Sequence, residues 1–154
     1  MPFRYVNDHC WVTAPTQSLR HWDKCIYQYG HINHHQNAHG IFRASPLDIA
    51  KDLDMPPKQV KASLQHLHDL GLIKWIPLTD TIWVKDYVST QPKYNNIFTA
   101  IITALRQEPL ELAQEYVAYY NDLGLWKKHG VDVSEFLPIV KVSNTKETPR
   151  KKRG

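Results

Sequence analysis

One stretch of the chain, residues 45–87, constrains the fold more than any other. It reads SPLDIAKDLDMPPKQVKASLQHLHDLGLIKWIPLTDTIWVKDY. Ser45 followed by Pro46 is typical of a helix start, because serine caps free backbone N–H groups and proline fits the first helical position. Asp48 completes a capping box, with Asp in the place of the usual Glu. A Met-Pro-Pro segment then ends this short helix, since proline cannot continue the hydrogen-bond ladder.

The same prolines predict the start of a second helix, from about Pro57 to Leu70. Val60, Leu64 and Leu67 share one face of it at helical spacing. The early exposed face is expected to consist of Lys58, Gln59, Lys61, Ala62 and Gln65. These residue types suit a DNA groove, because Lys contacts phosphate or guanine, Gln reads adenine and Ala allows close approach. An ordinary solvated helix surface has a similar composition, so both interpretations stay open.

A β-hairpin is predicted after the second helix. Gly71 has the position of a C-terminal helix cap. The alternating residues of 72–77 and the β-branched and aromatic residues of 81–87 predict two strands joined by a short turn over 77–80. Helix, turn, helix and hairpin in this order predict a winged helix-turn-helix within a mainly α fold with a small β-sheet. The second helix of such a unit usually enters the DNA major groove.

Three lysines outside the second helix are candidates for flanking phosphate contacts: Lys51 before it, and Lys74 and Lys85 on the two predicted strands. The predicted turn of the hairpin carries Asp80 and no basic residue, so we expect it to grip phosphate poorly. This acidic turn favours a competing hypothesis, in which the winged helix binds a protein partner and never contacts DNA. A transcription regulator of the same fold is a further alternative.

The segment before residue 45 is expected to complete the winged unit. A helix is predicted from about Ser18 to Tyr29, ended by Gly30. A polar loop over 31–39 follows, and then a short strand over 40–44. We expect this strand to pair with the hairpin and form a three-stranded sheet.

Two additional C-terminal helices are predicted after a linker over 88–94, one ending near Gln107 and the other running from Pro109 to about Leu123. Their apolar faces are too large for solvated appendages, so we expect them to pack on the winged unit or on a second copy of it. A homodimer is therefore expected. The predicted organisation is a winged-helix domain over 1–94, a two-helix extension over 95–124, and an extended arm with a disordered basic tail over 125–154.

The charge of the chain is concentrated at its C-terminal end. The whole sequence has a formal net charge of +4, but the residues from 141 onward hold six Lys or Arg and one Glu. The first 140 residues therefore have a net charge of −1. The predicted tail contacts are Arg150, Lys151, Lys152 and Arg153. Such tails attract phosphate in a sequence-independent and salt-dependent way.

A family resemblance is carried by fourteen residues taken in order. They are Trp11, Tyr29, Asn33, Gly40-Ile41-Phe42, Leu67, Gly71-Leu72-Ile73, Trp83-Val84, Gln91 and Asn95. Over roughly residues 3–106 the chain resembles the N-terminal winged-helix domain of phage replisome-organiser and DnaD-like replication initiation proteins. The resemblance implies double-stranded DNA binding during replication initiation, self-association and recruitment of other replication proteins. The chain departs from fuller versions because no large second domain follows, which leaves open a compact relative or a fragment.

The histidines require a test for a metal site. The possible ligands are His31, His34, His35 and His39, together with His9, Cys10, His21 and Cys25. Zinc needs about four converging ligands, whereas the chain has no Cys-x2-Cys pair and the loop would have to fold around the ion. We therefore expect no native metal site and no cofactor, although the sequence does not decide whether the loop over 31–39 binds metal.

No enzyme is predicted. The chain contains no glycine-rich phosphate loop before a helix, no G-x-S-x-G and no H-E-x-x-H. Asp48, Asp52 and Asp54 are explained by helix capping and helix termination rather than by a nuclease site. With two cysteines, no signal-peptide core and no long apolar run, the chain is expected in a reducing cytoplasm, without a membrane or small-molecule partner.

Overall fold

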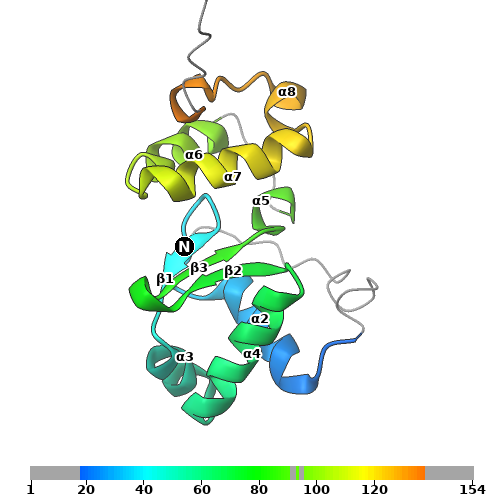
Figure 1. The fold of residues 1–154 in the computed structure, drawn as a ribbon, viewed down its shortest axis with the longest axis vertical. Helices are drawn as coiled ribbons and strands as arrows, with labels where there is room; N and C mark the ends of the chain where they lie inside the picture. Colours follow the sequence, from blue (N-terminus) through cyan, green and yellow to red (C-terminus); the bar gives the residue numbers. More distant parts are fainter. Residues whose placement is uncertain (1–17, 91–92, 94–95, 138–154) are drawn as a thin grey trace, which may run out of the picture. The chain divides into compact units, whose positions relative to one another are not determined.

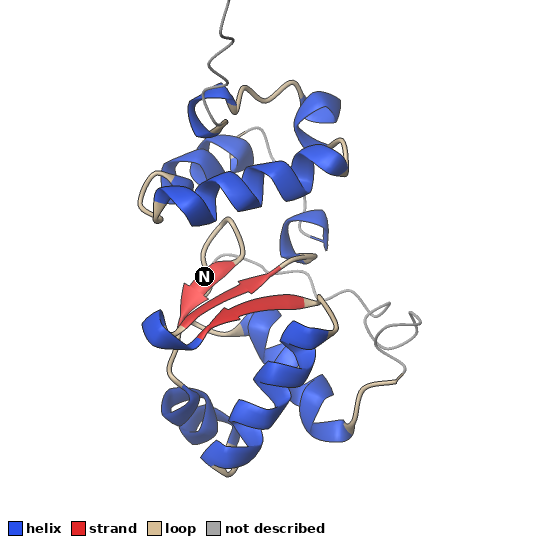
Figure 2. Cartoon of the chain, viewed as in Figure 1, coloured by secondary structure: helices blue, strands red, loops and turns tan. Residues whose placement is uncertain are grey.

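The structure is a computed structural model that describes residues 18–90, 93 and 96–137. The chain divides into two compact units, Met1–Gln107 and Glu108–Gly154, and each is described by itself. The described residues are mainly helical, with a small three-stranded antiparallel sheet (Figures 1 and 2). Within the described part of the chain, no helix combines the length and the apolar character needed to cross a membrane.

The first unit contains the winged helix. Its elements in chain order are α2 (His21–Ile32), β1 (Ile41–Arg43), α3 (Pro46–Leu53), α4 (Pro57–Asp69), β2 (Ile73–Ile76), the 3₁₀ turn η2 (Pro77–Thr79), β3 (Thr81–Val84), α5 (Tyr87–Thr90) and α6 (Ile97–Leu105). The strand order is β1-β3-β2, and both pairings are antiparallel. The predicted fold class, a mainly α winged helix-turn-helix with a small sheet and additional C-terminal helices, is confirmed.

The helix-turn-helix follows the chemistry of its boundaries. The Asp48 amide donates to the Ser45 hydroxyl at 3.1 Å, and the Ser45 amide donates to the Asp48 carboxylate at 3.2 Å. Asp54 then adopts the left-handed conformation, with φ at 53°, and ends α3. Gly71 follows the C-cap of α4 and also has a positive φ, at 74°. These two turns set the directions in which the chain enters α4 and leaves it for β2.

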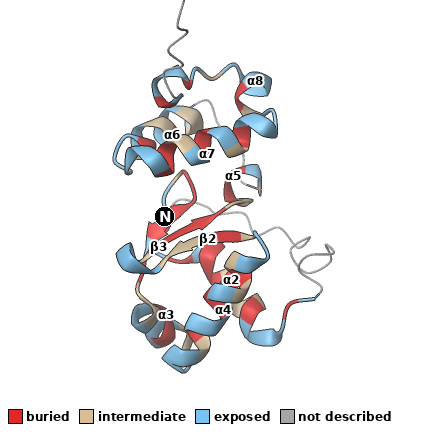
Figure 3. Cartoon of the chain, viewed as in Figure 1, coloured by how far each residue is buried: buried red, intermediate tan, exposed pale blue. Residues whose placement is uncertain are grey.

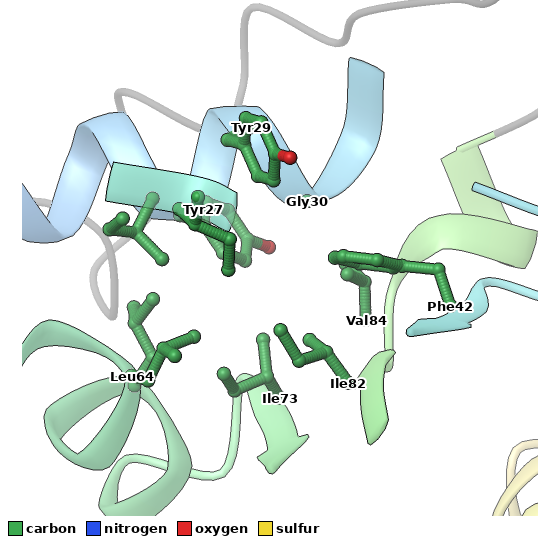
Figure 4. A pocket seen from close by; sticks show the side chains of 11 residues that line it. Tyr27, Tyr29, Gly30, Phe42, Leu64, Ile73, Ile82 and Val84 are labelled. Atoms are coloured by element: carbon green, nitrogen blue, oxygen red, sulfur yellow. The ribbon is translucent and has the colours of Figure 1, made fainter. Parts of the chain in front are cut away.

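The core of the first unit lies between the sheet and the two helices α2 and α4 (Figure 3). Ile73, Ile82 and Val84 of the sheet face Ile26 of α2 and Leu64 of α4 around a small cavity (Figure 4). Its volume is about 10 Å³, which is room for no more than one water molecule. Its lining is almost wholly apolar, so we interpret it as a packing void rather than a ligand site.

Gly30 lies inside α2 and does not end it. The helix begins and ends three residues later than predicted and runs through Gly30 to Ile32. A Cβ atom on Gly30 would lie 2.8 Å from Cγ2 of Val84, closer than two carbon atoms can approach without movement. The glycine is therefore explained by close contact between α2 and the sheet. The predicted helix end at this position was wrong.

Two short helices occupy segments that were not predicted to be helical. The returning strand was expected to reach Tyr87, but β3 ends at Val84 and Tyr87 begins α5. The extended arm was expected to begin at residue 125, whereas α8 (Leu125–His129) occupies its first residues. Both errors arise because helices of four or five residues are too short to show a helical repeat in the sequence.

The second unit is built around an aromatic cluster. It contains α7 (Leu110–Asp122), α8 and the 3₁₀ turn η3 (Ser134–Phe136). Trp126 of α8 donates from its indole nitrogen to the Val117 carbonyl at 2.9 Å, and its ring centroid lies 5.9 Å from that of Tyr120. Tyr116, Tyr120 and Trp126 are all buried. The indole bond and the ring contacts hold α8 against α7.

Candidate nucleic-acid interface

The helix α4 has one buried side and one solvent-exposed side. Val60, Leu64 and Leu67 are almost completely buried. The exposed positions of the predicted reading face are Lys58, Lys61, Ala62 and Gln65, and Gln59 is half-buried. We call these five residues the α4 face. They come from just over two turns of one helix, whose opposite side is packed against α2, α3 and β2.

The two glutamines of the α4 face hydrogen-bond along their own helix. Gln65 donates to the Asp69 carboxylate at 2.8 Å, and Gln59 donates to the Ser63 hydroxyl at 3.3 Å. A glutamine amide has two N–H donors and a carbonyl acceptor, so each side chain is oriented and retains further hydrogen-bonding groups. Asp69 also places a negative charge at the end of this face.

Lys51 is the flanking lysine nearest to the α4 face in the chain. It is exposed on α3, and α3 packs directly on α4. Asp48 and Asp52 are exposed on the same short helix. The charge contributed by α3 is therefore mixed, and Lys51 alone adds a cation to the helix-turn-helix on this side.

Lys74 and Lys85 do not lie with the α4 face. Residues directly opposite each other on neighbouring strands project to the same side of a sheet. Ile73 pairs with Val84 on the side that meets α2 and α4, whereas Lys74 pairs with Trp83 and so projects to the other side. The Lys85 amine lies 5.5 Å from the centre of the Trp83 ring, which places Lys85 on that second side too. The structure therefore brings Lys51, but not these two lysines, toward α4.

The candidate residues predicted from the sequence did not include Arg43, a basic residue near the turn of the hairpin. Arg43 is exposed at the end of β1 and pairs with Thr81 at the start of β3. The next residue, Ala44, donates from its amide to the Asp80 carbonyl at 3.1 Å. Arg43 therefore lies beside the turn that the sequence had suggested to be purely acidic. Only the strand register reveals this, because the two segments are far apart in the chain.

A partly buried polar network fixes the end of α2. His31 contacts the Tyr27 carbonyl through Nδ1 and the Asp86 carboxylate through Nε2, both at 2.8 Å, and the Tyr27 hydroxyl also donates to Asp86. Both partners of the imidazole are acceptors, so the ring satisfies both only when it is protonated. Burial lowers the pKa of His31, but Asp86 and the Tyr27 carbonyl outweigh it and raise the pKa above its usual range.

Among the described residues, the histidines and cysteines that were weighed as metal ligands do not form one cluster. His31 belongs to the network with Asp86, and His39 is buried at 1% exposure. His21 lies with its Nε2 3.9 Å from the Cys25 sulfur, and His9 and Cys10 are outside the described residues. His34 and His35 lie together near the surface. Their third neighbour is Asp52 of α3 rather than a third histidine.

The tail residues Arg150, Lys151, Lys152 and Arg153 also lie outside the described residues, as do Trp11, Gln91 and Asn95 of the resemblance. Comparison with protein-family models, with curated proteins and with solved structures found no match to this chain.

Proposed function

We propose that the chain is a double-stranded DNA-binding protein that uses α4 as its reading helix. The observation that carries the proposal is the α4 face. Lys58, Lys61 and Gln65 project to solvent beside the small Ala62, while the other side of the helix is held in the core. A lysine supplies phosphate or guanine contacts, a glutamine supplies an adenine contact, and alanine lets the helix approach the base edges.

The biological setting rests on the sequence resemblance. We propose a role in replication initiation in a phage or plasmid-like system, as a cytoplasmic homodimer that recruits replication proteins. A transcription regulator would use the same surface. A footprint at an origin or at a promoter separates these two roles, because the helix-turn-helix itself is common to both.

A second candidate function is protein recognition without DNA contact. The hydrogen bond between Gln65 and Asp69 places an acid on the α4 face, and α3 adds Asp48 and Asp52 beside Lys51. The first 140 residues have a net charge of −1. Such a mixed surface favours a partner that presents both charges over a polyanion.

The experiment that separates the two candidates is a salt titration of DNA binding, on random duplexes and on a duplex selected from a random library. Lys61→Ala should weaken binding to every sequence and reduce the salt slope by about 1, since it removes one phosphate contact. Gln65→Ala should relax the preference at one base pair, at a cost of about 1–3 kcal/mol on the selected site only. Lys128→Ala, on α8 of the second unit, is the matched control and should change neither property.

The tail is tested by a chain shortened to end at Val140. If the shortened chain binds DNA and responds to Lys61→Ala, the folded unit is the reader. If the shortened chain no longer binds, or if Lys61→Ala and Lys128→Ala behave alike, the α4 face is not a DNA surface and protein recognition is the better conclusion.

A further inference from the structure

The loop after α2 and the helix α3 bring three potential metal ligands together. His34, His35 and Asp52 each offer a donor atom, and these atoms all lie within 4.8 Å of one another. His34 Nδ1 is 4.0 Å from the Asp52 carboxylate, and the rings of His34 and His35 have centroids 3.8 Å apart. In a tetrahedral zinc site the ligand atoms are roughly 3.4 Å apart, given bonds of about 2.0–2.1 Å. Small side-chain rotations would therefore close these gaps.

The backbone that carries the two histidines is held in place by buried amide side chains. Asn33 donates to the Tyr29 carbonyl at 2.8 Å and accepts from the His35 amide at 2.9 Å. Gln36 donates to the Gly30 carbonyl at 2.7 Å, and both amide residues are buried. The loop is therefore bonded to the last turn of α2. It need not fold around an ion, which was the objection to a metal site at the level of sequence.

The carboxylate is also oriented before any ion binds. The Tyr29 hydroxyl donates to Asp52 Oδ2 at 2.7 Å. A phenol hydroxyl can donate this bond while the carboxylate keeps further lone pairs for an ion. Ligating carboxylates are commonly fixed by such outer hydrogen bonds, and losing one typically costs 10- to 100-fold in metal affinity. Tyr29 is therefore a positioning residue for Asp52.

We propose that His34, His35 and Asp52 bind one divalent transition-metal ion, with Zn²⁺ the best fit. Two imidazoles and one carboxylate suit Zn²⁺ and its neighbours, whereas Mg²⁺ and Ca²⁺ prefer oxygen ligands alone. Three protein ligands leave a position for water. The ion would link the loop after α2 to α3, the first helix of the helix-turn-helix. None of the three ligands belongs to the α4 face, and the proposal does not depend on DNA binding.

The test is a calorimetric titration of ZnCl₂ into the full chain, freed of any purification tag and of bound metal. One equivalent of Zn²⁺ should bind, and MgCl₂ should give no saturable signal. His34→Ala, His35→Ala and Asp52→Asn should each weaken Zn²⁺ at least tenfold. Tyr29→Phe should weaken Zn²⁺ by about tenfold, and His129→Ala, an exposed histidine of the second unit, is the matched control.

A second measurement distinguishes a metal effect from a folding defect. Bound Zn²⁺ should raise the thermal unfolding midpoint of the wild-type chain, because a ligand that binds only the folded state stabilises it. The Asp52→Asn chain should fold but show no such rise at the same Zn²⁺ concentration. The proposal is overturned if Asp52→Asn binds as tightly as wild type, if His129→Ala loses as much affinity as His34→Ala, or if binding does not saturate.

Discussion

The substitution Gly30→Ala tests how closely α2 packs on the sheet. Gly30 lies in the last turn of α2, and a Cβ atom there would be 2.8 Å from Cγ2 of Val84. Val84 is completely buried in the central strand β3. Its branched side chain has few alternative rotamers, so the added methyl group must push the helix and the strand apart.

The size of the effect follows from two opposing terms. Carbon atoms in contact are normally about 3.5–4.0 Å apart, so the overlap is close to an ångström in a filled core. Overpacking of this kind costs about 1–3 kcal/mol, and the buried strand puts this case in the upper half of the range. Replacing Gly by Ala within a helix stabilises it by about 1 kcal/mol. We therefore expect a net destabilisation of about 1–2 kcal/mol.

A double-mutant cycle isolates the contact. Val84→Ala alone should cost roughly 2 kcal/mol, because it removes buried methyl groups. The same change provides room for the new methyl group at position 30. The pair Gly30→Ala and Val84→Ala should therefore be more stable than the sum of the single changes by about 2 kcal/mol. Urea denaturation followed by NMR intensities of β3 amides measures the first unit alone.

Gly71→Ala is the matched control for this cycle. Gly71 has φ at 74°, and a Cβ atom there would meet nothing within 4 Å. Its substitution should cost about 1–2 kcal/mol from backbone strain, with no coupling to Val84→Ala. The packing argument is refuted if Gly30→Ala is neutral or stabilising, or if it couples to Val84→Ala no more strongly than Gly71→Ala does.

Two further predictions concern hydrogen bonds of the first unit. Because the pKa of His31 is raised in the folded state, the stability from its charged form is complete below about pH 6.5. This stability is lost as the pH rises through the folded pKa of His31, so the urea midpoint of the wild-type chain should fall over that range. The midpoint of His31→Gln should fall less. An equal change of the midpoint with pH in both chains would contradict the role of Asp86. Ser45→Ala removes the cap of α3 and should cost about 1 kcal/mol, whereas Ser45→Asp should retain most of that stability.

The sequence predicted the elements whose boundaries depend on local chemistry. The Ser45 cap, the prolines before α4 and Gly71 each act within a few residues, and α3 and α4 begin and end close to the predicted positions. The pairing of β1 with the hairpin was also predicted, because β-branched and aromatic residues mark all three strands. Local signals of this kind are strong enough to place a winged helix without knowledge of its core.

The sequence is least informative for residues whose role depends on distant partners. Gly30 was read as a helix end because its contact, Val84, is more than fifty residues away in the chain. Asp52 was assigned to helix termination, and α3 does end at the next residue, Leu53, but nothing in the sequence places Asp52 beside His34. Lys74 and Lys85 were predicted to flank α4 on phosphates, but the sequence does not show which side of the sheet they occupy. Register and packing decide all three cases, and neither can be read from a single segment.

The charge of the α4 face limits what one folded unit can do on DNA. Lys51, Lys58 and Lys61 are the lysines that α3 and α4 expose together, and three phosphate contacts give a salt slope of only about −2.7. A protein that makes 6–10 such contacts would show a slope of about −5 to −9. Two copies would double the slope, and the tail from 150 to 153 adds four more basic residues. If the shortened chain shows a slope near −2.7, one copy binds at a time and the tail only adds affinity in the full chain. A slope near twice that value means that two copies share one DNA site, so that the homodimer is the form that reads DNA.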